Sequence, residues 1–264
     1  MKIIQHFIVN NDNFKENRQI IVKGLMAHSI GVPQPDAKIL VRNFNVPRPN
    51  GRQVGVHGFM GEDGILYQTL PWNHRAWHCG AGANGSGNNT HIGIEITEPN
   101  TIEYTRGSQF IDYNPVRTRE FVHNTYKHAV KHFAYLCRMY KLDPLADGVI
   151  ISHAEGHQRG IASNHGDIDH IWNYTGLSMN QFRLDIATEL RNGQQHDVEV
   201  MEVIEMRFDT VQEVKAAHPW AVDTVEKLIN RKLLHGNNQD STGLDLSLDM
   251  IRMFVINDLA GLYD

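Results

Sequence analysis

The chain has 264 residues, of which 41% are hydrophobic and 21% are charged, and this composition excludes a wholly disordered protein. No stretch approaches the roughly 18 uncharged apolar residues that a membrane span needs. The formal net charge of -5 argues against nucleic acid or an anionic membrane as a partner, and the 2 cysteines exclude a disulfide-rich scaffold.

Predicted strands and helices alternate along residues 1–192. The start of the chain lacks the apolar core of about 7–15 residues that a signal peptide has, so we expect no unaided secretion. Helical spacing of apolar residues predicts a long helix over about residues 117–140, and a capping box at Ser178 begins a last helix that ends before Gly193. Apolar runs predict strands at residues 3–9, 25–27, 54–59, 65–70, 91–96 and 149–151. This alternation predicts an α/β domain.

The chain changes character after residue 192. Polar residues between Arg191 and Asp197 predict a linker, which we assign to residues 193–207. Residues 195–264 carry a net charge of -7, whereas the remainder carries +2. Over residues 208–264, a capping box at Thr210, a helix from Pro219 to Gly236 and a helix capped by Ser247 predict a small, mostly helical domain.

Histidine is the residue type in excess, with 16 copies gathered in a few places. Histidine is the commonest metal ligand, and catalytic zinc needs three protein ligands with one open position. His28 and His153 each follow a short apolar strand, and neighbouring strands would bring their ends together. The loop that returns fourteen residues later would bring Asp167 to the same ion. Singly, each histidine is more often structural; together they predict a zinc set.

Other candidate groups have competing interpretations. Glu95 faces away from its strand neighbours Ile94 and Ile96, so it is either an exposed glutamate or a general base beside a metal. His128 and His132 stand four apart but lie off the apolar stripe of their helix, which favours a solvated face. A nucleophilic Cys79 would need an orienting base and a third group, so a cysteine hydrolase is disfavoured. His57 and His78 receive no role.

Five motifs in one order resemble the zinc-dependent N-acetylmuramoyl-L-alanine amidases of the type-2, peptidoglycan-recognition-like family. The resemblance covers about residues 1–190 and looks most like endolysins from phages or prophages of Gram-positive bacteria. It implies a mixed central sheet flanked by helices. The motifs that carry it are Gly24-Leu25-Met26-Ala27-His28-Ser29, Glu62-Asp63-Gly64-Ile65-Leu66-Tyr67-Gln68, Ala76-Trp77-His78-Cys79-Gly80, His91-Ile92-Gly93-Ile94-Glu95, and Ser152-His153 with His165-Gly166-Asp167.

The resemblance also implies the roles of individual residues. His28, His153 and Asp167 would bind Zn²⁺, Glu95 would act as the acid/base, and His165 would stabilise the oxyanion. A long insert over residues 155–164 departs from the compact members, which makes His165 the second choice for the third ligand. Some relatives carry a tyrosine before the histidine of the hairpin strand; Val56 stands there, so no tyrosine role transfers.

The implied substrate is peptidoglycan, cleaved between N-acetylmuramic acid and L-alanine after the protein passes from the cytoplasm of the producing bacterium to the wall. The tail resembles wall-binding modules of clostridial-type endolysins, so residues 208–264 would bind the cell wall or make a homo-oligomer. Two alternatives remain. One is a peptidoglycan-binding protein without catalysis, and the other is a His-Asn-His nuclease using His165, Asp167, His170 and Asn173, which the acidic charge disfavours.

Overall fold

The computed structural model describes residues 1–192, 199–202, 207–236 and 243–263. The chain divides into two compact units, Met1–Val203 and Ile204–Asp264. Most of the predicted linker over residues 193–207 lies outside the described residues. None of the described helices combines the length and the apolar content that crossing a membrane requires.

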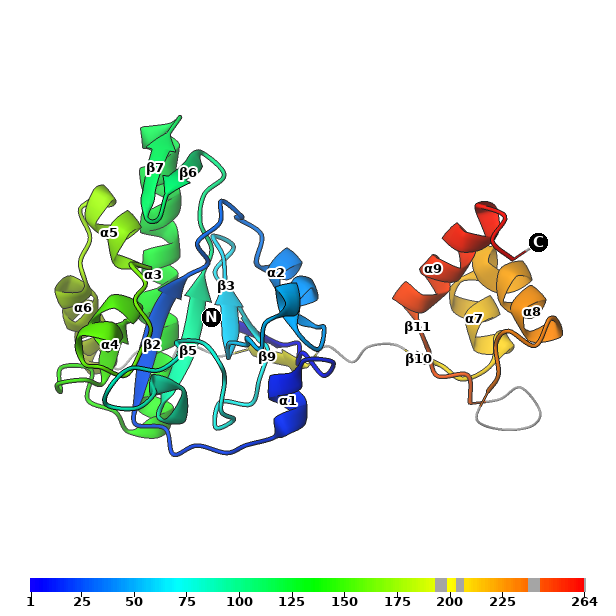
Figure 1. Ribbon diagram of the computed structural model, residues 1–264, viewed down its shortest axis with the longest axis horizontal. Helices are drawn as coiled ribbons and strands as arrows, with labels where there is room; N and C mark the ends of the chain where they lie inside the picture. The colour runs from blue at the N-terminus through cyan, green and yellow to red at the C-terminus, as the bar shows by residue number, and fades with distance from the viewer. Residues whose placement is uncertain (193–198, 203–206, 237–242, 264) are drawn as a thin grey trace. The chain divides into compact units, whose positions relative to one another are not determined.

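The first unit is built around a mixed seven-stranded sheet, as the resemblance implied (Figure 1). The strand order is β8-β2-β5-β3-β4-β1-β9, in which only the β3–β4 pair is antiparallel. The strands are β1 (Lys2–Gln5), β2 (Gly24–Ser29), β3 (Gly58–Met60), β4 (Ile65–Gln68), β5 (His91–Ile96), β8 (Ile150–Ser152) and β9 (Glu199–Glu202). Four parallel strands, β8, β2, β5 and β3, therefore end at one edge of the sheet, where side chains from distant parts of the sequence meet.

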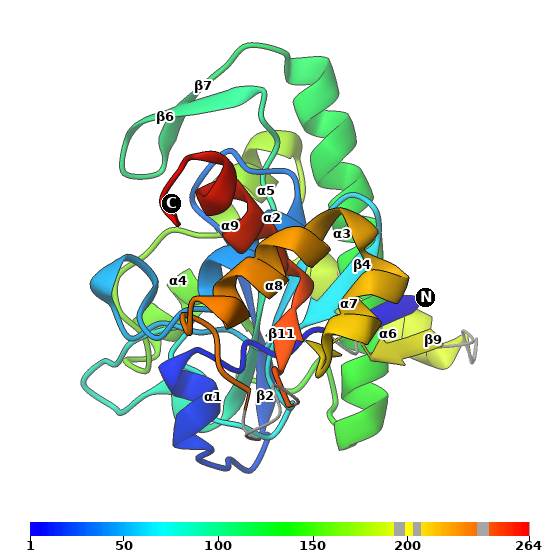
Figure 2. The ribbon, with the colours of Figure 1, turned by 90° about the vertical axis from the view of Figure 1, so that its right-hand side faces the viewer.

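Helices cover both faces of this sheet (Figure 1). The long helix α3 packs with α5 and α6 over one face, and α2 packs against Phe59 and Tyr67 on the other. A separate hairpin of β6 and β7 precedes α3 and stands beside its first turns (Figure 2). The remaining elements are α1 (Asp12–Glu16), α2 (Ala37–Phe44), β6 (Ile102–Arg106), β7 (Gln109–Asp112), α3 (Pro115–Tyr140), α4 (His153–Gln158), α5 (Asp169–Thr175) and α6 (Met179–Arg191), with short 3-10 turns at Pro49–Gly51 and Gly87–Asn89.

Trp172 lies at the centre of the contact between α3, α5 and α6. Its side chain is 1% exposed, and its ring packs edge-on against Phe182 and Tyr126, with centroids 4.8 and 5.2 Å away. Trp172→Ala should lower the free energy of unfolding by about 3–5 kcal/mol, because the cavity cannot close fully. Urea denaturation measures this, with the half-exposed Leu184→Ala as control; equal losses in the two variants would contradict the central place of Trp172.

Three predictions for the first unit are wrong. Residues Glu199–Glu202 of the predicted linker form strand β9, because they pair with β1 and satisfy the backbone hydrogen-bonding groups along its outer edge. His132 is buried rather than solvated, since the turn after β3 packs on α3 and the carbonyl of Gly64 accepts a hydrogen bond from the His132 ring at 2.9 Å. Ser178 does cap α6, but the side chain of Gln181 bonds to Asp185 instead of completing a capping box.

The second unit is small and mostly helical, as predicted. The capping box of Thr210 with Glu213 and the Ser247 cap are both confirmed. The helix that starts near Pro219 ends at Asn230 rather than Gly236, because Lys232 takes a left-handed conformation and Leu233 bonds back to Leu228. Its elements are β10 (Arg207–Phe208), α7 (Val211–Ala217), a 3-10 turn at Pro219–Ala221, α8 (Val222–Asn230), β11 (Leu246–Ser247) and α9 (Leu248–Leu259).

Candidate metal and catalytic site

Three side chains from distant parts of the sequence converge at the carboxyl edge of the parallel strands. His28 lies near the end of β2, His153 begins α4 directly after the neighbouring strand β8, and Asp167 lies in the loop before α5. One ligand atom from each lies within 4.8 Å of the other two. The two Nδ1 atoms are 3.1 Å apart, and the Asp167 oxygens approach Nδ1 of His28 at 3.1 Å and Nδ1 of His153 at 3.5 Å.

These separations suit a shared cation. Ligands that bind one zinc ion at about 2.0–2.2 Å in a tetrahedral arrangement lie about 3.3 Å from one another. The Nε2 atoms of both rings have partners elsewhere, at His78 for His28 and at Ser163 for His153. The two Nδ1 atoms and the carboxylate oxygens therefore point at one another, and a divalent cation between them would take a lone pair from each.

The charge states of the ligands agree with this chemistry. Burial lowers the pKa of His28, so its ring is neutral, as a metal ligand must be. Burial alone would raise the pKa of Asp167, but the adjacent imidazoles of His153 and His28 lower it overall and keep the carboxylate ionised. Two imidazoles and one carboxylate form a donor set that fits Zn²⁺.

Glu95 stands directly beside the ligand set. The parallel register of β2 and β5 pairs Glu95 with His28, so the two side chains lie on the same face of the sheet. One carboxylate oxygen of Glu95 is buried and has no hydrogen-bond partner among the described residues. Burial, then the charges of Asp167 and Glu98, raise the pKa of Glu95 well above its ordinary value. The site thus holds a carboxyl group whose raised pKa suits it to binding and releasing a proton during a reaction.

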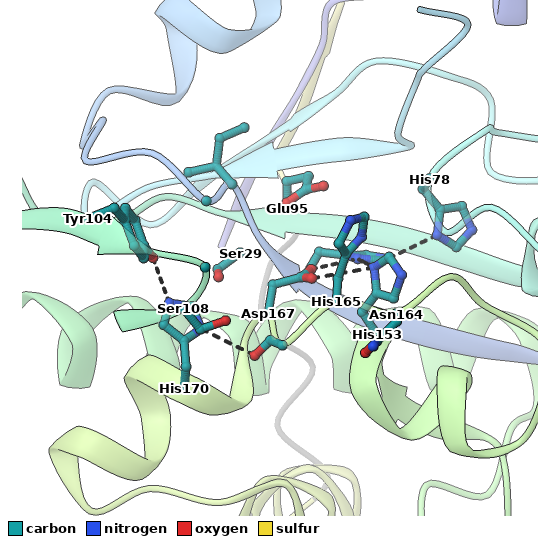
Figure 3. A pocket seen from close by; sticks show the side chains of 15 residues that line it. Ser29, His78, Glu95, Tyr104, Ser108, His153, Asn164, His165, Asp167 and His170 are labelled. Carbon is teal, nitrogen blue, oxygen red and sulfur yellow. Dashed lines mark hydrogen bonds and ion pairs between the residues drawn. The ribbon is translucent and has the colours of Figure 1, made fainter. Parts of the chain in front are cut away.

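A pocket of about 560 Å³ opens over these groups (Figure 3). His28, His153, Asp167 and Glu95 all line it, and Glu95 faces it from β5. His165 also lines the pocket; it is exposed, and its ring centroid is 4.8 Å from that of His153. The structure therefore brings all five residues singled out in the sequence to one pocket, with Asp167 rather than His165 in the three-residue ligand cluster.

Tyr104 and His170 line the far wall of the pocket, and buried Glu98 is bonded to Tyr104. The sequence patterns indicated neither Tyr104 nor Glu98. Tyr104 on β6 donates a hydrogen bond to buried Glu98 at 2.8 Å, and its hydroxyl lies 2.5 Å from Nε2 of His170. Burial raises the pKa of Glu98 to about 7, against hydrogen bonds from Ser29 and Tyr104. Of these residues only His170 was noticed in the sequence, because it lies in a histidine-rich segment. Tyr104 lies on an inserted hairpin, and no spacing pattern in the sequence connects such a hairpin with the site.

Two alternative chemistries find little support in this geometry. Cys79 is buried, and burial raises the pKa of its thiol to about 11, which opposes a nucleophilic thiolate. Of the nuclease-like residues, Asp167 faces the two ligand histidines, His170 is engaged with Tyr104, and Asn173 lies exposed on α5.

Two proteins with similar sequences are both N-acetylmuramoyl-L-alanine amidases. A 40-residue segment is 50% identical to the N-acetylmuramoyl-L-alanine amidase CwlH and another match of 40 residues is 55% identical to XlyA, both from Bacillus subtilis. These matches cover 15% of this chain and only 16% and 13% of the two relatives.

Solved structures share the fold. The Staphylococcus aureus hydrolase AmiA, solved with its ligand, is 17% identical with a TM-score of 0.54, over 74% of this chain and 86% of AmiA. The catalytic domain of XlyA is 21% identical with a TM-score of 0.51, over 70% of this chain and 99% of that domain. The sequence profile of the family Amidase_2, N-acetylmuramoyl-L-alanine amidase, matches residues 16–169, which include every residue of the ligand cluster. The chain belongs to this amidase family.

Proposed function

We propose that this protein is a zinc-dependent enzyme that hydrolyses the amide bond between N-acetylmuramic acid and L-alanine in peptidoglycan. The observation that carries the proposal is the convergence of His28, His153 and Asp167, two imidazoles and a carboxylate, beside Glu95 in one open pocket. Membership of the family supports the reaction class.

Each residue of the site has its own role in the proposed reaction. His28, His153 and Asp167 would hold Zn²⁺, which when bound lowers the pKa of water towards about 7 and polarises the carbonyl under attack. Glu95 takes a proton from the attacking water, because its carboxyl lies beside His28 and its pKa is raised. His165, exposed at the rim of the same ligand cluster, donates a hydrogen bond to the oxygen on which negative charge develops.

The same glutamate completes the reaction. A carbon–oxygen bond forms at the lactyl carbonyl while the carbon–nitrogen bond to L-alanine breaks. An amine is a poor leaving group unless it is protonated, so the proton that Glu95 took from water passes to the nitrogen. Each turnover consumes one water and leaves Glu95 in its starting state.

Mass spectrometry of digested cell walls tests the proposal. Purified sacculi incubated with the protein should yield peptides with free L-alanine amino termini, while the glycan strands stay intact. New reducing sugar ends would contradict the amidase. Binding to the walls with no soluble product would instead indicate a peptidoglycan-binding protein without catalysis, and nicking of a plasmid would indicate a nuclease.

Cys79→Ala should leave zinc content and wall hydrolysis within about twofold of the wild type. The thiol lies against Asn88, away from the ligand atoms, and its raised pKa keeps it protonated. Turnover of sacculi, with and without a thiol-alkylating reagent, measures this. Loss of turnover in a folded Cys79→Ala protein would favour the cysteine hydrolase.

We further propose that the protein lyses bacteria from inside, released from the cytoplasm to the wall as a phage or prophage endolysin. A mutant endolysin from Bacillus subtilis, 20% identical with a TM-score of 0.50 over 70% of this chain and 97% of that one, shares the fold and supports this role. Expression of the chain together with a holin should lyse a sensitive Gram-positive host, whereas lysis without a holin would contradict the release route.

For residues 208–264 we propose cell-wall binding or self-association. In α9, Ile251 packs inside the unit, whereas Met253, Ile256 and Leu259 are 56%, 61% and 84% exposed. Ile256→Asp in the full chain should therefore weaken retention on sacculi or shift the sedimentation coefficient to that of a monomer. No change in either property would contradict both roles.

A further inference from the structure

His78 lies directly behind the ligand His28, on the side away from Asp167. Nδ1 of His78 is 2.9 Å from Nε2 of His28, and Nε2 of His78 is 3.1 Å from the backbone carbonyl oxygen of His91. A carbonyl oxygen only accepts hydrogen bonds, so Nε2 of His78 carries a proton and donates it. The hydrogen bond between His78 and His91 therefore runs from Nε2 of His78 to the carbonyl oxygen.

The direction of the hydrogen bond between His28 and His78 follows from that proton position. A neutral imidazole carries one ring proton, so Nδ1 of His78 has a lone pair and accepts a hydrogen bond from Nε2 of His28. His28 then carries a proton on Nε2, and its Nδ1 is the ring nitrogen that faces His153 and Asp167, where a bound metal ion would take its lone pair. A dication on the far side of His28 would oppose a second proton on the neighbouring His78 ring.

The ring of His78 is held in place from three sides. The side chain of Asn88 accepts a hydrogen bond from its backbone N–H at 2.9 Å. The ring of His57 packs edge-on at a centroid distance of 5.9 Å. The third side is Gly93 of β5: a Cβ atom there would lie 2.5 Å from Cγ of His78. Any side chain at residue 93 would thus displace the ring.

His57 is in turn fixed to the same strand. The backbone N–H of Gly93 donates to Nδ1 of His57 at 3.0 Å, and Nε2 of His57 donates to the carbonyl of His74 at 2.7 Å. The two histidines without a role in the reaction therefore form one packed unit around Gly93, and that unit ends on the metal-facing His28.

We propose that His78 is a positioning residue that fixes the tautomer and orientation of His28, so that Nδ1 of His28 is presented to the metal ion. This inference rests on the proposed function, in which His28 is a zinc ligand. It differs from the more usual arrangement in which a carboxylate or carbonyl orients the ligand histidine, because here a second imidazole does so and a backbone carbonyl orients that imidazole in turn.

The tautomer is directly measurable in the metal-free full chain. Long-range ¹H–¹⁵N NMR correlations of the imidazole rings should show a proton on Nε2 of His28, and His78 protonated at Nε2 and bare at Nδ1. A bare Nε2 on His28, or a proton on Nδ1 of a neutral His78, would overturn the inference without any variant.

Zinc affinity, measured with zinc alone by competition against a chelator, gives the second test. His78→Ala should weaken zinc binding by about 10- to 100-fold, the usual effect of removing a partner of a ligand histidine. His78→Asn should recover much of this loss, because its amide oxygen can accept the hydrogen bond from Nε2 of His28. Gly93→Ala should weaken zinc binding as His78→Ala does, since it displaces the same ring.

His132→Ala is the matched control, because the His132 ring is likewise bonded to a backbone carbonyl through Nε2, but on α3 and outside the pocket. It should keep the wild-type zinc affinity. Wild-type affinity in a folded His78→Ala protein would overturn the inference and leave the proposed function intact. Failure of the wild-type chain to bind zinc, with the Nε2 tautomer of His28 in place, would overturn the proposed function instead. If His78→Ala does not fold, the NMR result and the His78→Asn variant decide.

Discussion

Glu95→Gln is expected to keep the zinc content of the wild type and to lose about 10²- to 10⁴-fold in turnover of peptidoglycan, the usual contribution of a general acid/base. Glutamine keeps the size and the position of the side chain on β5, but it cannot take a proton from water or give one to the leaving amine. The loss should lie in kcat, since Glu95 acts on the reacting atoms rather than on the bound glycan.

Release of soluble wall fragments measures turnover, and zinc analysis of the same samples measures the zinc content. Glu103→Gln is a suitable control, because Glu103 is an exposed glutamate on the neighbouring β6–β7 hairpin, outside the pocket. If Glu95→Gln kept a tenth or more of the wild-type turnover, Glu95 would lose its assigned role.

Asp167→Ala is expected to abolish hydrolysis and to weaken zinc binding on the order of a thousandfold. Structural zinc sites bind with about 10–16 kcal/mol distributed over four ligands, so one ligand accounts for several kcal/mol. The two imidazoles that remain, His28 and His153, lack the negative charge that balances the ion.

The matched variant is His165→Ala, which separates the two candidates for the third ligand. His165 is exposed at the pocket, whereas Asp167 contacts both Nδ1 atoms, so His165→Ala should bind zinc like the wild type and lose only turnover. The reverse pattern, with zinc retained by Asp167→Ala and lost by His165→Ala, would reassign the third ligand to His165.

The parts of the fold that local patterns determine were predictable from the sequence. The strand at residues 91–96 has the predicted bounds, and the helix predicted at 117–140 is α3 at Pro115–Tyr140, because an apolar period and a proline-bounded end act within the segment itself. The meeting of His28 with His153 also followed from sequence, since both end short apolar strands that turned out to be neighbours.

The rest depends on contacts that no local pattern records. His132 looked solvated because it lies off the apolar stripe of its helix, yet the turn at Gly64 covers it. Glu95 could not be placed until the register of β2 and β5 set it opposite His28. Tyr104 and His170 form a wall of the pocket, and Tyr104 is bonded to the buried Glu98. These three residues come from segments separated by loops, so their hydrogen bonds became visible only in the folded chain.

Anomalous scattering at the zinc edge, from crystals of the full chain grown with zinc, shows directly whether the three side chains hold one ion. We expect one strong peak at about 2.0–2.2 Å from Nδ1 of His28, Nδ1 of His153 and a carboxylate oxygen of Asp167, with a fourth position open to the pocket. A zinc ion bound elsewhere, or none between these three side chains at saturating zinc, would contradict it.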